Sequence, residues 1–111
     1  MGAEIFGSRG CGDTVAEAFR KAYDQACYDH GHAGYSGSLA EKHSYWEAVL
    51  PADVPPKVFL TWVEGYDLET IPAQHQRLVQ QAHDVWDDKW GPALALRVGP
   101  KEWYFCGWAS S

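Results

Sequence analysis

Features that mark secreted, membrane-spanning or zinc-binding proteins are scarce in this chain of 111 residues. No apolar run approaches the roughly 20 residues that cross a bilayer, and the N-terminus has neither the basic segment nor the long apolar run of a signal peptide. The cysteines are odd in number and lack paired Cys-x-x-Cys spacing; they are Cys11, Cys27 and Cys106. These absences predict a soluble, cytoplasmic protein with reduced thiols, no membrane partner and no metal site.

Positive charge is also scarce. The chain has nine lysines and arginines against fifteen aspartates and glutamates, which gives a formal net charge of −6. This balance argues against a nucleic-acid polymer or an anionic membrane surface as the main partner. No Gly-Lys-Ser/Thr sequence of a Walker phosphate loop occurs, and no internal repeat or low-complexity tract is found. The length fits a single domain over residues 1–111 that buries a core without metal or disulfides, and no cofactor is expected.

Aromatic residues, in contrast, are abundant: the chain has six tryptophans, six tyrosines and four phenylalanines. A domain of this size buries only part of such a set in its own core. The remainder predicts an interface with another chain, or a pocket in which a ligand stacks against aromatic rings.

The first third of the chain predicts a strand followed by an amphipathic helix. Residues 3–8 have the composition of a strand, with Ile5 as the expected core contact. Residues 14–17 form a capping box, after which apolar residues recur at helical spacing until Gly31 ends the helix. Between the two elements, Arg9 and the free backbone N–H groups at the helix start can hold an anion; the alternative is a plain linker.

Glycines recur at every third position in the turn that follows this helix. The segment 34–38 offers a stacking face at Tyr35 and hydroxyls at Ser36 and Ser38. Its glycines let backbone N–H groups approach a phosphate or a ribose. The alternative is a tight connection that needs glycine for its geometry alone.

Residues 37–46 alternate in the manner of a strand. This pattern places Glu41 and His43 on one face and Lys42 on the other, so Glu41 and Lys42 are not expected to form a local ion pair. Glu41 and His43 can serve as an acid–base pair, although such pairs are common by chance.

The second half of the chain predicts helices and a hairpin. Prolines forbid a long regular element over residues 46–56, and residues 57–63 fit a strand or two helical turns, with the helix favoured. A second clear helix is predicted from Thr70 to Trp90. Residues 93–98 and 102–109 predict a β-hairpin.

The last strand of this hairpin is apolar or aromatic on both faces. Such a strand is central in its sheet, or its second face meets a partner chain or a ligand. The predicted fold is therefore α+β: an antiparallel sheet of about four strands with the two main helices packed on one face. Because a small domain can hardly cover so much apolar surface alone, a homo-oligomer is expected.

The end of the second helix is a further candidate site. In residues 87–92, two carboxylates and Lys89 lie beside Trp90, and this group can line the mouth of a pocket; the alternative is a solvated helix terminus. The full set of candidate ligand-binding residues is Arg9, His32, Tyr35, Ser36, Ser38, Glu41, Lys42, Lys89, Trp90 and Trp108.

Three motifs occur in order along the chain. They are Gly-Tyr-x-Gly-x-x-Ala-Glu-Lys within residues 28–42, Lys-Trp-Gly-Pro-Ala within residues 87–93, and Gly-Trp-Ala-Ser within residues 105–110. Their combination resembles a set of small, mostly uncharacterised bacteriophage proteins, and residues 46–70 lie outside the resemblance. The resemblance implies a phage origin and residence in the host cytoplasm. Small phage proteins often block host defence, some by trapping nucleotide signals in aromatic pockets between protomers.

The functional hypothesis combines these observations. Aromatic stacking faces, backbone donors and a few cations favour a binding protein that sequesters a small nucleotide-like ligand at an oligomer interface, as a sponge for an immune signal. One alternative is a small hydrolase that uses Glu41, His43 or His32 on the same class of ligand. The other is a protein–protein inhibitor of a host factor that acts through the aromatic hairpin and the acidic surface.

Overall fold

A computed structural model describes residues 2–30 and 37–110. Within them one sheet contains the strands β1 (Ala3–Cys11), β2 (Tyr45–Glu47), β3 (Ala93–Gly99) and β4 (Glu102–Ser110). The helices are α1 (Val15–His30), α2 (Pro56–Gly65) and α3 (Gln76–Asp87), with short 3₁₀ helices η1 (Leu39–Glu41) and η2 (Ala73–His75). The strand order is β1-β4-β3-β2, antiparallel except for the parallel pair β2–β3. The predicted α+β class and four-stranded, mostly antiparallel sheet are confirmed.

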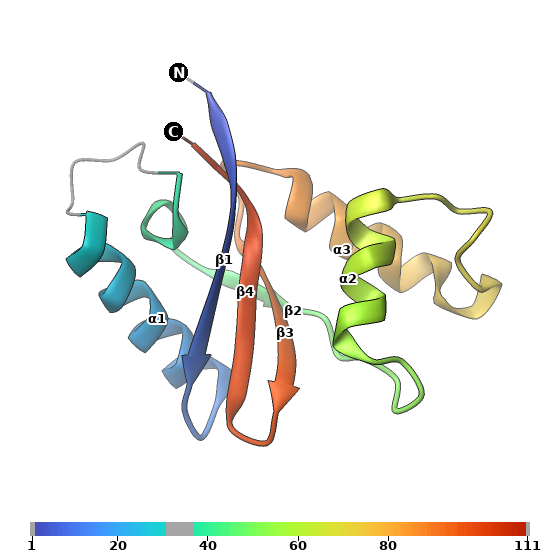
Figure 1. Cartoon of the computed structure of the whole chain (residues 1–111), viewed down its shortest axis with the longest axis horizontal. Coiled ribbons are helices and arrows are strands. Elements are labelled where there is room, and N and C mark those ends of the chain that lie inside the picture. Colours follow the sequence, from blue (N-terminus) through green and yellow to red (C-terminus); the bar gives the residue numbers. More distant parts are fainter. Residues whose placement is uncertain (1, 31–36, 111) are drawn as a thin grey trace.

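The helices cover both faces of the sheet (Figure 1). Helix α1 packs on one face, and α2 and α3 pack on the other. This distribution differs from the expectation of two main helices on one face. The physical reason lies in β4, where Phe105 is buried toward α1 and Cys106 is buried toward α3. A strand with apolar residues on both faces needs a helical layer on each side.

Helix α1 meets the sheet through small buried side chains, although the sheet adds large ones such as Trp103 and Phe105 to this core cluster. Ala18, Ala22 and Ala26 recur at helical spacing and are buried against the sheet. Gly10 on β1 lies so close to the helix that an added Cβ would meet the carbonyl oxygen of Ala18 at 2.3 Å. The predicted cap of this helix is present, since the backbone N–H of Glu17 donates to the Thr14 hydroxyl at 3.2 Å.

The face covered by α2 and α3 is packed with larger side chains. Phe59, Val63, Val79 and Trp86 from the helices meet Leu94 and Leu96 from β3. This layer includes the 57–63 segment, for which the helical prediction is confirmed. Helix α3 begins at Gln76 rather than at Thr70, because Pro72 precedes a separate 3₁₀ turn.

Two local predictions in the first half of the chain are wrong. Ile5 is 54% exposed, whereas its neighbour Phe6 is buried in the core. The predicted strand over residues 37–46 is mostly the η1 turn, in which the Ser38 hydroxyl accepts a hydrogen bond from the backbone N–H of Ala40 at 3.2 Å. A serine that caps a turn competes with strand pairing, and only residues 45–47 join the sheet.

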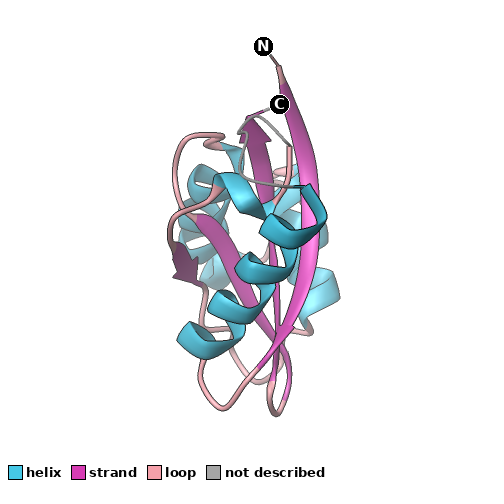
Figure 2. Ribbon diagram, turned by 90° about the vertical axis from the view of Figure 1, so that its left-hand side faces the viewer, coloured by secondary structure: helices cyan, strands magenta, loops and turns pink. Residues whose placement is uncertain are grey.

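The molecule is thin along one axis, with extents of 42 × 34 × 16 Å. Figure 1 looks down the shortest axis and shows β1 in front, β4 and β3 behind it, and helices to either side. Figure 2 shows α1 lying across the sheet and β1 along its margin. The short dimension is therefore close to the direction from strand to strand. No helix of the described residues is long and apolar enough to cross a membrane.

Candidate functional site

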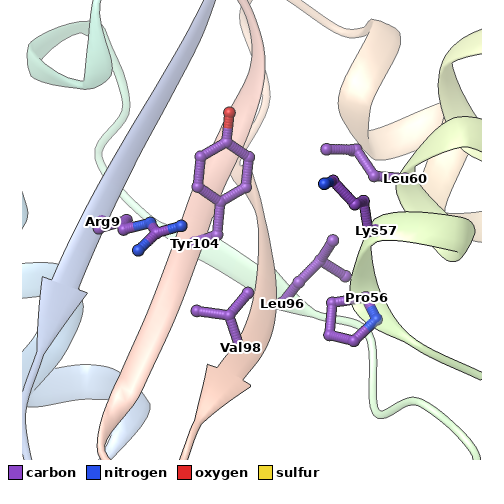
Figure 3. A pocket seen from close by; sticks show the side chains of 7 residues that line it. All are labelled: Arg9, Pro56, Lys57, Leu60, Leu96, Val98 and Tyr104. Carbon is purple, nitrogen blue, oxygen red and sulfur yellow. The ribbon is translucent and has the colours of Figure 1, made fainter.

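A cavity of about 440 Å³ lies between α2 and the open part of the sheet (Figure 3). It forms because α2 and α3 cover β3 and β4 but leave β1 uncovered on this side. The lining residues are Arg9, Pro56, Lys57, Leu60, Leu96, Val98 and Tyr104. This volume falls in the range of about 300–1,000 Å³ that is usual for small-molecule sites.

Two cations reach the cavity from opposite walls. Arg9 projects from β1, and Lys57 lies in the first turn of α2. The Arg9 guanidinium is 3.7 Å from the Glu102 carboxylate, and the Arg9 side chain is 70% exposed. An ion pair that is this long and this exposed contributes little, so Arg9 keeps most of its capacity to bind an anion.

The floor of the cavity combines aliphatic side chains with one phenol. Leu96 is buried, and the hydroxyl end of the Tyr104 ring lies next to Gly7 of β1. Gly7 makes this position possible, because a Cβ there would meet the Tyr104 hydroxyl. The Tyr104 side chain therefore occupies the space that a side chain at position 7 would fill, and it lines the cavity together with Arg9.

The Tyr104 hydroxyl keeps its proton at neutral pH. Burial raises the pKa of Tyr104, and the negative potential of Cys106 and Glu64 adds to the increase, whereas Arg9 opposes it. The phenol can therefore donate one hydrogen bond and accept another. Together with the two cations, it suits a ligand that carries an anionic group and a flat, partly apolar body.

Several residues predicted to bind ligand lie at the other end of β1, and one of them is fully engaged by the fold. Lys42 is 1% exposed, and its Nζ donates to the carbonyl oxygens of Asp88 at 2.9 Å and Gly91 at 3.1 Å. Burial lowers the pKa of Lys42, and the nearby Asp88 carboxylate opposes this shift. The side chain ties the residues after η1 to the turn after α3.

The neighbours of Lys42 in the sequence also make contacts within the fold. Ser38 caps η1, and the Ser110 hydroxyl lies 3.4 Å from the Glu41 carboxylate. His43 is exposed, but it follows a 3₁₀ turn rather than sharing a strand face with Glu41. The three motifs of the resemblance thus converge at one end of the sheet, through contacts among residues 37–42, 88–91 and 110.

The remaining aromatic and basic candidates have different surroundings. Trp108 is half-buried and packs edge-to-face on Trp86, with ring centroids 6.0 Å apart. Trp90 is 68% exposed, and the Lys89 ammonium lies 5.1 Å from its ring centroid. Lys89 also reaches the carbonyl oxygen of Gly2 at 3.4 Å.

The predicted site residues that the structure describes do not gather at one site. Ser38, Glu41 and Lys42 come together with the 88–91 turn, whereas Arg9 lies apart from them at the cavity. His32, Tyr35 and Ser36 lie outside the described residues, so the glycine turn stays a prediction.

The sequence reasoning missed Lys57, Leu60 and Tyr104. The two-faced last strand, which contains Tyr104, was the one relevant signal, and no local pattern connected Lys57 or Leu60 with a site. Within residues 2–30 and 37–110, no three His, Cys, Asp or Glu side chains gather as a metal site would require. Comparisons with protein-family models, curated proteins and solved structures return no match for this chain.

Proposed function

We propose that this protein binds a small nucleotide-like anion in the cavity between α2 and the sheet. The observation that carries the proposal is the placement of Arg9 and Lys57 on opposite walls above an apolar and aromatic floor. The cations would hold a phosphate, and the Tyr104 ring and hydroxyl would contact the base or the ribose. In a chain with a net charge of −6, two cations at one cavity favour a small anion over a nucleic-acid polymer.

The test is calorimetry with a panel of cyclic and linear adenine and guanine nucleotides. We expect the wild type to bind at least one of them, and Arg9→Ala to weaken that binding about tenfold or more, which is about 1.4 kcal/mol. Arg77→Ala is the matched control, because it removes the same charge from an exposed position on α3. Equal losses in the two variants would show that Arg9 acts only through net charge. No binding across the panel would reject the proposal.

The same experiment separates binding from hydrolysis. A protein that sequesters its ligand returns it intact after denaturation, whereas a hydrolase using Glu41, His43 or His32 returns products. Mass spectrometry of the released ligand makes the distinction. Retention of a host protein by the immobilised chain, with no nucleotide bound, would instead support a protein–protein inhibitor.

The biological setting follows from the resemblance and belongs to the same proposal. We propose that the chain is a bacteriophage protein acting in the host cytoplasm, where it sequesters a nucleotide signal of host defence. We also propose a homo-oligomer. An oligomer is expected from the sequence because both faces of the last strand are apolar. In the structure, helices of the same chain cover both faces of β4. The oligomer therefore needs a different surface.

A further inference from the structure

Strand β1 is an edge strand of the sheet, with two charged residues, Glu4 and Arg9. It lies at the end of the sheet order and is hydrogen-bonded only to β4 among the described residues. Its register with β4 runs over nine residues, from Ala3 to Cys11, without a bulge. The strand contains no proline and no lysine, which are the residues that commonly block edge pairing.

The shape of the molecule places this edge on one of its two broad sides. The strand-to-strand direction is close to the 16 Å axis, so β1 runs across the front of the 42 by 34 Å outline in Figure 1. Figure 2 shows the same strand at the margin of the sheet. The edge of β1 therefore lies where a strand of another chain can approach it.

We propose that a second copy of this chain pairs with β1 in antiparallel orientation about a two-fold axis at Gly7, giving a continuous eight-stranded sheet. Antiparallel pairing of a strand with itself is self-complementary, so the same surface serves both copies. In this register Glu4 lies opposite the partner's Gly10, on the face of the sheet that α1 covers, so no like charges lie opposite each other.

This register places Ile5 directly opposite the partner's Arg9, on the face of the sheet that holds the cavity. Ile5 is 54% exposed in the single chain, and the pairing covers it. Because Arg9 lines the cavity, the partner's Ile5 then lies at the rim of that site. The inference rests on the proposed homo-oligomer and deepens it, but it needs no ligand.

Charge changes at Ile5 test the surface and the register together. Sedimentation velocity should give a dimer for the wild type. Ile5→Lys should weaken the dimer at least about tenfold by placing like charges opposite each other, whereas Ile5→Glu should leave it intact or tighten it by facing the partner's Arg9. Val49→Lys is the control, since Val49 is 77% exposed and follows β2 at the opposite edge of the sheet.

Two results would overturn the inference. A monomer for the wild type at up to about 100 μM, far above the dissociation constant of a stable dimer, would reject the oligomer and its surface together. A dimer that resists Ile5→Lys would reject the β1 surface and leave the oligomer standing. Neither result bears on nucleotide binding by Arg9, which calorimetry measures separately.

Disulfide cross-linking gives an independent measure of the register. Pairing about Gly7 places Ala3 opposite the partner's Cys11, whose side chain is exposed. Under mild oxidation, Ala3→Cys should give a covalent dimer, and Ala3→Cys combined with Cys11→Ser should not. Failure of the single variant to cross-link would contradict the register.

Discussion

The two faces of the sheet are packed in different ways. On the α1 face, alanines of the helix meet alanines of the sheet, and the helix backbone reaches van der Waals contact with Gly10 of β1. On the other face, Phe59 and Trp86 fill a wider space above β3 and β4, and β1 stays uncovered. The alanines let α1 approach the sheet closely, whereas α2 and α3 leave a cavity beside Arg9. The face that carries the cavity is the one with room for a ligand.

The largest expected effect is on the free energy of unfolding, and it is measured by replacing one glycine on each face of the sheet. Gly10→Ala should lower the free energy of unfolding by about 3 kcal/mol, because its Cβ would lie 2.3 Å from a backbone oxygen of α1 that cannot turn aside. Gly7→Ala should cost less than about 1 kcal/mol, because the obstructing atom is the tip of the Tyr104 side chain, which can rotate away. Urea denaturation measures both. Equal costs would show that the two faces do not differ in rigidity.

The second expected effect concerns the lysine that joins the two helical layers. Lys42→Ala should lower the free energy of unfolding by about 2–3 kcal/mol, since it leaves a cavity and two carbonyl oxygens without their donor. Lys89→Ala should change it by less than about 0.5 kcal/mol, because that side chain makes only surface contacts. Thermal and urea unfolding compare the two. A neutral Lys42→Ala would mean that the contact does not hold the layers together.

The third expected effect is a loss of stability at alkaline pH, which is caused by a cysteine on the face covered by α2 and α3. Burial, aided by the Glu64 charge, raises the pKa of Cys106 from 9.0 to about 12. The Cys106 thiol ionises near the lower value in the unfolded chain and near the higher value in the folded chain. The free energy of unfolding is therefore unaffected by this group below about pH 9 and decreases as the pH rises toward 12. This single group contributes a loss of about 1.4 kcal/mol per pH unit in that window. Cys106→Ala should reduce the slope by that amount in urea titrations at pH 8 to 11; an unchanged slope would assign it to other groups.

Much of the fold could be predicted because its signals are local. The capping box at Thr14 and the hairpin turn near Gly99 depend on neighbours within a few residues, and both are present. The two-faced β4 strand indicated a central position, which the sheet order confirms. The side on which each helix packs depends on contacts far apart in sequence, and its prediction was correspondingly less accurate.

The candidate site was harder to predict for the same reason. Arg9 and Lys57 are 48 positions apart and meet only because α2 leaves β1 uncovered. Lys42 and Lys89 are both basic residues beside a glycine-containing turn, yet one is 1% exposed and hydrogen-bonded to the backbone and the other lies at the surface. Residue type and spacing did not distinguish a lysine that supports the fold from one that is free to bind a ligand.

The pairing of β1 with β4 has a consequence for how the chain reaches its native state. The longest ladder in the sheet runs from the pair Ala3–Ser110, 107 positions apart, to the pair Cys11–Glu102, 91 positions apart. Contacts between such distant segments close a large loop, which slows folding compared with local pairing. Because β4 follows β1 by about 90 residues in the chain, β1 can join the sheet only after nearly all of the chain has been synthesised.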